Sequence, residues 1–133
     1  MDRISGDIAL KMGEHVKIAD RILDDWRRGG FLDAYGAQIL AFVLDFSFYD
    51  ALKLSDEDFG KIARALADVL GKYWSADQIA ALGLSGADSK MASAVFSPNS
   101  FGGFARKRIA LEHYAQMYGR RAAAHRLIEV LFH

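Results

Sequence analysis

Apolar residues recur along this chain at helical spacing rather than at the alternate positions of strands. From Asp7 to Arg28 they recur at roughly helical spacing, and the pair Gly29-Gly30 ends the segment. No stretch shows sustained alternation, and the sequence has no Asn-Gly or Asp-Gly hairpin signal. The pattern predicts one all-α domain over residues 1–133, a bundle of five or six helices.

Two segments of the predicted bundle stand out. The stretch from about residue 31 to 50 is the most apolar in the chain, and a helix that is apolar around most of its girth is usually buried among its neighbours. We expect it to be the central helix. From about Phe104 to the end of the sequence, the pattern predicts a long basic helix.

Two helix starts are marked by capping residues. Ser55 precedes the acids Asp56, Glu57 and Asp58, and the helix dipole favours negative charge in a first turn. Ser75 and Gln78 repeat the pattern as a capping box. Capping is therefore the structural interpretation of the three acids, beside any role in binding.

Composition narrows the class of protein. Hydrophobic residues make up 52% and charged residues 26% of the 133 positions, as in ordinary globular domains. There are no cysteines, which excludes disulfides, thiolate metal sites and cysteine nucleophiles. The N-terminal residues contain no apolar signal-peptide core, and no uncharged run approaches the ~20 residues of a membrane span. We expect a soluble cytoplasmic protein without membrane association.

Charge is balanced overall but unevenly distributed. Residues 1–100 carry 11 basic and 15 acidic side chains, net −4, and residues 101–133 carry 6 and 2, net +4. Such asymmetry can mark a surface for nucleic acid or an acidic partner. It can equally let one end of the chain pack on the other, which is the interpretation we favour.

Motifs for catalysis and cofactors are missing. The sequence has no glycine-rich phosphate loop, HExxH, GxSxG or CxxC. Glu14-His15 and Glu112-His113 form two similar pairs, but adjacent residues diverge by about 100° on a helix and cannot share one metal. We expect no metal site and no cofactor.

The stretch from Arg108 to His113 resembles the R-x4–6-H motif of HEPN ribonucleases, which are all-α domains of similar length. In that family the arginine and the histidine cleave RNA across a dimer interface. The resemblance covers this motif alone, and Ile109 stands where the family usually has a polar residue. It implies an alternative function, RNA binding or cleavage by Arg106 or Arg108 with His113.

Helical geometry separates these candidates. Residues seven apart share a helix face and residues five apart do not, so His113 lies on the side of Arg106 and away from Arg108. That side is apolar and also contains Arg120. His113 is expected to be partly buried with a structural partner. Asp45, a carboxylate inside the apolar stretch, is a candidate partner for Arg120.

For nucleic acid, the basic residues Arg106, Lys107, Arg108, Arg121 and Arg126 surround the helix and form no single stripe. The sequence therefore favours a protein partner over nucleic acid. Our leading hypothesis is a non-enzymatic protein-binding module, concretely a bacterial immunity- or antitoxin-type inhibitor of a toxin or nuclease domain. Acids that mimic phosphate would make the contact, and the candidates are Asp20, Asp24, Asp25, Asp56, Glu57 and Asp58.

Overall fold

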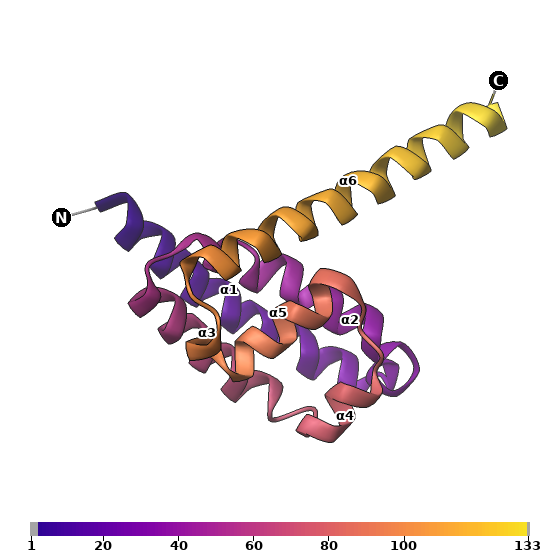
Figure 1. Ribbon diagram of the computed structural model, residues 1–133. Coiled ribbons are helices and arrows are strands. Elements are labelled where there is room, and N and C mark those ends of the chain that lie inside the picture. The colour runs from indigo at the N-terminus through magenta and orange to yellow at the C-terminus, as the bar shows by residue number, and fades with distance from the viewer. Residues whose placement is uncertain (1–2, 133) are drawn as a thin grey trace.

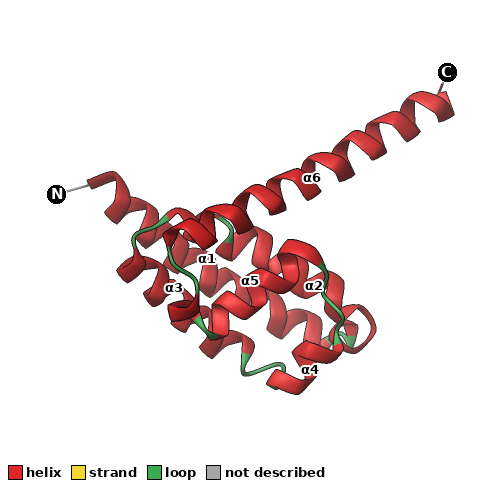
Figure 2. Cartoon of the chain, viewed as in Figure 1, coloured by secondary structure: helices red, strands yellow, loops and turns green. Residues whose placement is uncertain are grey.

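The computed structural model describes residues 3–132, apart from the side chains of residues 3–9, 123, 127 and 132. The described chain is helical throughout and has no strand, which confirms the all-α prediction (Figures 1 and 2). Six α-helices and two short 3-10 helices follow in the order α1 (Arg3–Arg28), α2 (Phe31–Phe48), η1 (Asp50–Lys53), α3 (Asp56–Leu70), α4 (Ala76–Ala81), α5 (Gly86–Phe96), η2 (Pro98–Ser100) and α6 (Gly103–Phe132).

The predicted helix starts are confirmed. At α3, the Asp58 backbone N–H donates to Ser55 Oγ over 3.2 Å. At α4, the Ser75 and Gln78 side chains each accept a bond from the other's backbone N–H, over 3.1 and 2.8 Å. Between α1 and α2, Gly30 has φ +80°, a left-handed conformation that glycine adopts without steric cost.

The core lies where α2 packs against α1 and α5, with α3 closing the other side of α1. Leu40, Val43 and Leu44 of α2 are fully buried, and the Phe48 ring lies 5.3 Å from that of Phe59 on α3. The central-helix prediction therefore holds for the inner face of α2. Within the described residues, the segment Phe31–Lys53 is long and apolar enough to cross a membrane, and 44% of its best window is buried in the bundle.

The outer face of α2 differs from the expectation of burial all round. Phe31, Tyr35 and Phe42 are each about half exposed. The Phe31 and Tyr35 rings pack together with centroids 6.5 Å apart, and non-helical backbone angles at Tyr35 kink α2 between this pair and Phe42. The bundle thus leaves part of α2 uncovered, and these apolar rings remain at the surface.

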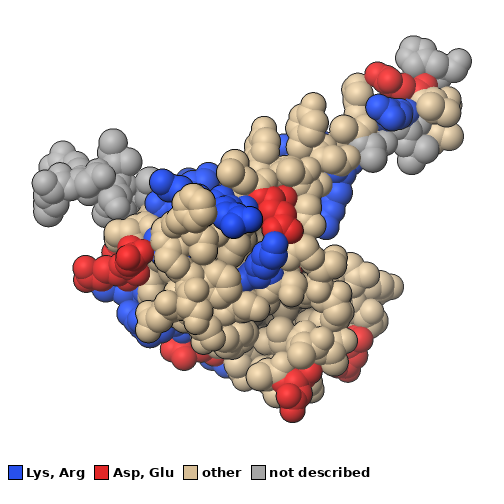
Figure 3. All heavy atoms as spheres, in the orientation of Figure 1, with Lys and Arg blue, Asp and Glu red and all other residues tan. Residues whose placement is uncertain are grey.

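Helix α6 divides into two parts. Its first half packs against α5 and η1, and its second half extends far beyond the other helices (Figure 1). In the space-filling view the extended part stands clear of the bundle, and the surface is hollowed in the angle between them (Figure 3). We call residues 117–132 the projecting half of α6.

Candidate functional site

Arg106 is a buried structural residue at the start of α6. Its guanidinium donates to three backbone carbonyls: Leu52 O (3.3 Å), Leu54 O (3.0 Å) and Phe101 O (2.9 Å). It also lies 4.6 Å from the centre of the Phe59 ring, and its side chain is only 4% exposed. These contacts join α6 to η1, to the residue after η1, and to the loop that precedes α6. They also occupy the N–H donors that an RNA-cleaving arginine would direct at phosphate.

The same guanidinium also binds one of the predicted contact acids. Arg106 Nη1 lies 2.9 Å from Asp56 Oδ1, whose side chain is 84% exposed on its outer side. Asp56 is thus an internal partner of α6 as well as a member of the first turn of α3. Arg is suited to this position because its fork of donors can bind several acceptors at once.

His113 lies two turns further along the same face of α6 and is 3% exposed. Its Nε2 is 2.6 Å from Asp45 Oδ1 on α2, and its Nδ1 is 3.7 Å from Asp88 Oδ1 on α5. The Tyr49 ring packs against it with a centroid separation of 4.9 Å. The prediction of a buried histidine with a structural partner is confirmed, and His113 ties three helices together.

Arg120 has a different partner from the candidate Asp45. Asp45 bonds to His113, whereas Arg120 Nη2 lies 3.8 Å from Asp88 Oδ2. The sequence analysis missed Asp88, because an acid three residues after Ser85 reads as an ordinary first-turn residue. Its burial comes from α6 crossing above α5.

These groups form the base of an open cleft of about 490 Å³ between α2 and α6. Ala41 and Phe42 line one wall, Met117 and Arg120 line the other, and the loop before α5 closes one end with Leu84. Asp45 keeps 41% of its side chain exposed. The cleft therefore has one apolar wall, a second wall that combines Met117 with the guanidinium of Arg120, and a base that carries charged groups.

The buried face of α6 continues into the projecting half, where Arg120 interrupts its apolar residues. Ile109 and Ala110 face the bundle, and the helical repeat places Met117, Ala124, Ile128 and Leu131 along the same side. Beyond the cleft this stripe is uncovered, with Ile128 54% and Leu131 67% exposed. Tyr114 and Tyr118 beside the stripe are also exposed, at 63% and 65%.

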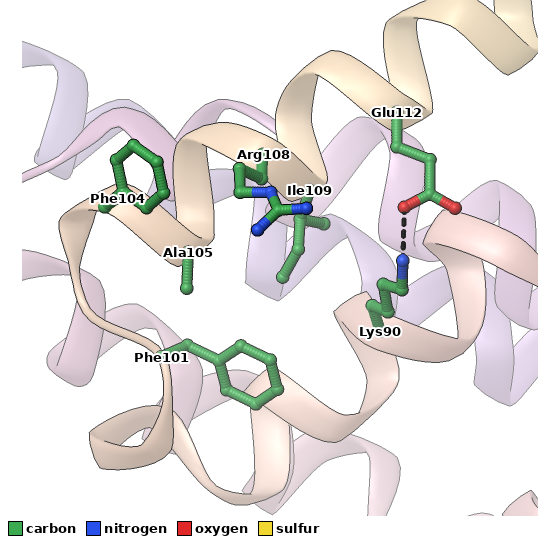
Figure 4. A pocket seen from close by; sticks show the side chains of 7 residues that line it. All are labelled: Lys90, Phe101, Phe104, Ala105, Arg108, Ile109 and Glu112. Atoms are coloured by element: carbon green, nitrogen blue, oxygen red, sulfur yellow. Dashed lines mark hydrogen bonds and ion pairs between the residues drawn. The ribbon is translucent and has the colours of Figure 1, made fainter.

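Arg108 lies elsewhere. It borders a shallow pocket of about 520 Å³ between α5 and α6, whose other residues include Phe101 and the ion pair between Lys90 and Glu112 (Figure 4). This pocket faces away from His113, as the helical geometry predicts. The structure thus brings together no solvent-facing arginine–histidine pair from Arg106, Arg108 and His113.

The three acids of α1 that were predicted as contacts have unequal surroundings. Asp20 accepts bonds from Lys72 Nζ (2.8 Å) and the Tyr73 hydroxyl (2.6 Å), which hold the pKa of its carboxyl below the ordinary value. Burial and the bond to Asp20 raise the pKa of Tyr73 to about 12. Asp24 pairs with Arg27 and Arg28 on its own helix, and Asp25 is exposed.

The two acidic sets do not form one surface. Asp20 contacts Lys72 just after the end of α3, whereas Asp56, Glu57 and Asp58 occupy its first turn. The 15-residue helix between them is about 22 Å long at 1.5 Å per residue. Glu57 pairs with Lys61 within α3. A single small contact cannot include both sets.

The residues that line the cleft limit the chemistry that it can carry out. No group of three or more histidine and acidic side chains within residues 3–132 is arranged to hold a metal ion. The polar groups of the cleft base bind one another, and the apolar surface lies on the walls and on the projecting half of α6. Such an arrangement is suited to contact with another polypeptide.

Comparison with known proteins gave no relative: no family model, curated protein or solved structure matches this chain.

Proposed function

We propose that this chain is a non-enzymatic domain that works by binding other protein chains. The observation that carries the proposal is the projecting half of α6, where Ile128 and Leu131 lie on one side of the helix and are each more than half exposed. Contiguous apolar surface outside a folded core is typical of interaction sites. An isolated helix of this length is only marginally stable in water. A partner that covers its apolar side would therefore stabilise it.

The polar contacts of α6 support binding over RNA cleavage. Arg106 is held by three carbonyls and Asp56, and His113 is buried against Asp45. Arg108 is exposed but borders a different pocket. Arg106 and Arg108 are the arginines that the ribonuclease hypothesis pairs with His113, and neither faces it across open solvent.

The concrete form of the proposal is an immunity- or antitoxin-type inhibitor in the cytoplasm of a bacterium, bound to a basic toxin or nuclease domain. The acids of α1 are its best candidate contact, because Asp25 is exposed and Asp24 is partly exposed at one end of the bundle. Opposite charges across an interface speed association and set specificity. The acids at the start of α3 serve capping and the bond to Arg106 in addition.

Partner capture with charge-reversed variants tests this form. The double variant Asp24→Lys with Asp25→Lys should retain at least tenfold less of a stoichiometric protein partner from the source cells than the wild type does. The matched control is Asp68→Lys with Asp77→Lys, the same charge change at two other exposed positions, which should retain it. The unfolding free energy of every variant, measured by urea denaturation, should stay within about 0.5 kcal/mol of the wild-type value.

Two outcomes would contradict the proposal. Equal retention by both double variants removes the α1 acids from the contact. Co-purifying RNA that dissociates in high salt, with no protein partner at all, would instead favour nucleic-acid binding by the basic residues of α6.

A further inference from the structure

The projecting half of α6 and the cleft between α2 and α6 are complementary surfaces on one chain. We propose that the projecting half of α6 docks in this cleft on a second copy, so that two copies exchange their helices in a symmetric dimer. The inference rests on the proposed function, since it names the occupant of the uncovered α6 surface. It leaves the acids of α1 free for a different protein.

One copy cannot fill its own cleft with this helix. Met117 and Arg120 form a wall of the cleft, and the same continuous helix then leads away from the bundle (Figure 1). Residues after 120 would have to break the helix to fold back. The hollow in the angle below the helix is therefore open to a second chain (Figure 3).

Both surfaces are apolar where they would meet. The cleft offers Ala41, Phe42 and Met117, and Phe42 is 49% exposed in the single copy. The incoming helix offers Ile128 and Leu131 on the side that continues its own buried face. Docking would cover the apolar side of the projecting half, as α5 and η1 cover the same side of the first half of α6.

The charges of α6 and of the rest of the chain are complementary. Residues 101–133 are net +4 and residues 1–100 are net −4, so contact of α6 with the bundle of another copy brings opposite net charges together. In the cleft, Arg121 and His125, which flank the stripe, would approach the exposed carboxylate of Asp45. The basic helix thus meets the acidic body of the other copy.

The contact is large enough for a stable dimer. The projecting half is about 24 Å long, and burying half the surface of such a helix removes roughly 400 Å² from water. In a two-fold dimer each copy contributes one docked helix and one cleft, so about 800 Å² of each copy is removed from water, which is the area per partner of a standard interface.

The mass of the purified protein tests the dimer. Light scattering should give twice the 14.7 kDa of one chain for the wild type. Ile128→Glu places a charge in the stripe and should weaken dimerisation at least tenfold. Val130→Glu is the matched control, because residue 130 lies about 200° around the helix from residue 128 and is 72% exposed. Since neither residue touches the bundle core, both variants should fold.

Cross-linking tests the arrangement, and the absence of native cysteines makes single-cysteine variants specific. A mixture of the Phe42→Cys chain with the Ile128→Cys chain should yield a mixed cross-linked dimer with a short bismaleimide. The mixture of Phe42→Cys with Val130→Cys should yield at least fivefold less. Cross-links that join Ile128→Cys chains only to one another would overturn docking in the cleft.

A wild type that stays monomeric at high concentration overturns the inference. Its failure is distinguishable from failure of the proposed function, because capture of a different protein by the monomer, lost in the Asp24→Lys with Asp25→Lys variant, would leave that function standing. Equal dimerisation of the Ile128→Glu and Val130→Glu variants would also overturn it.

Discussion

Residues 106–113 of α6 lie against η1, α2 and α5, whereas the projecting half of the same helix lies in solvent with its apolar stripe uncovered. Along the first part, Arg106 and His113 are used inside the fold. Along the second, Arg121 and His125 are exposed beside Ile128. The helical repeat extends one face across both parts, but only the first part has a bundle beneath it. Identical patterning therefore produces a structural element in one region and an available surface in the other.

The largest expected effect is at Arg106. Arg106→Met should leave three buried carbonyls without their donors, each costing about 1–3 kcal/mol. We expect a loss of about 3 kcal/mol or more of unfolding free energy, measured by urea denaturation.

Arg108→Met is the matched control for this substitution. The side chain is exposed, and its removal should change the unfolding free energy by less than about 0.5 kcal/mol. Similar losses at both positions would break the distinction between the buried and the exposed side of α6.

A smaller effect is expected at His113. His113→Ala removes the bond to Asp45 and the packing against Tyr49, and should cost about 2 kcal/mol in the same measurement. His125→Ala, whose side chain is 76% exposed, should change stability by less than about 0.5 kcal/mol. RNA cleavage by the wild type that disappears in a fully stable His113→Ala variant would contradict the structural role.

The smallest effect depends on pH and concerns the side of the bundle away from α6. The bonds from Lys72 and Tyr73 lower the pKa of Asp20 below 3.8, so its stabilisation is present above that pH and is lost as the pH falls through the lower folded value. Asp20→Asn should therefore be less stable than the wild type at pH 7, and the difference in unfolding free energy should shrink as the pH falls below 3.8 and through the lower folded pKa. A difference that stays constant from pH 7 to 2 would show that ionisation of Asp20 plays no part.

Tyr73 provides the alkaline counterpart. Burial raises the pKa of its hydroxyl from 10.0 to about 12, so its contribution is complete below pH 10 and is lost as the pH rises through about 12. The stability advantage of the wild type over Tyr73→Phe should disappear across that range, in denaturation curves recorded at each pH.

The sequence by itself determined the helices and several of their ends. Ser55, Ser75 and Gln78 cap as expected, because capping bonds join residues three apart and need no distant partner. It also placed Arg106 and His113 on one face of α6 and Arg108 on another, because the angle between helix positions is a local property.

Only the tertiary structure decided what those faces meet. The carbonyls that bind Arg106 come from residues 52 and 54, and the carboxylates beside His113 come from Asp45 and Asp88. These partners depend on how α2, α5 and η1 pack against α6. The periodicity along α6 alone does not specify that packing. The same holds for the end of the bundle along α6. The side of the helix with Ile128 and Leu131 repeats the pattern of a buried face, and it is uncovered because no other helix within residues 3–132 reaches it.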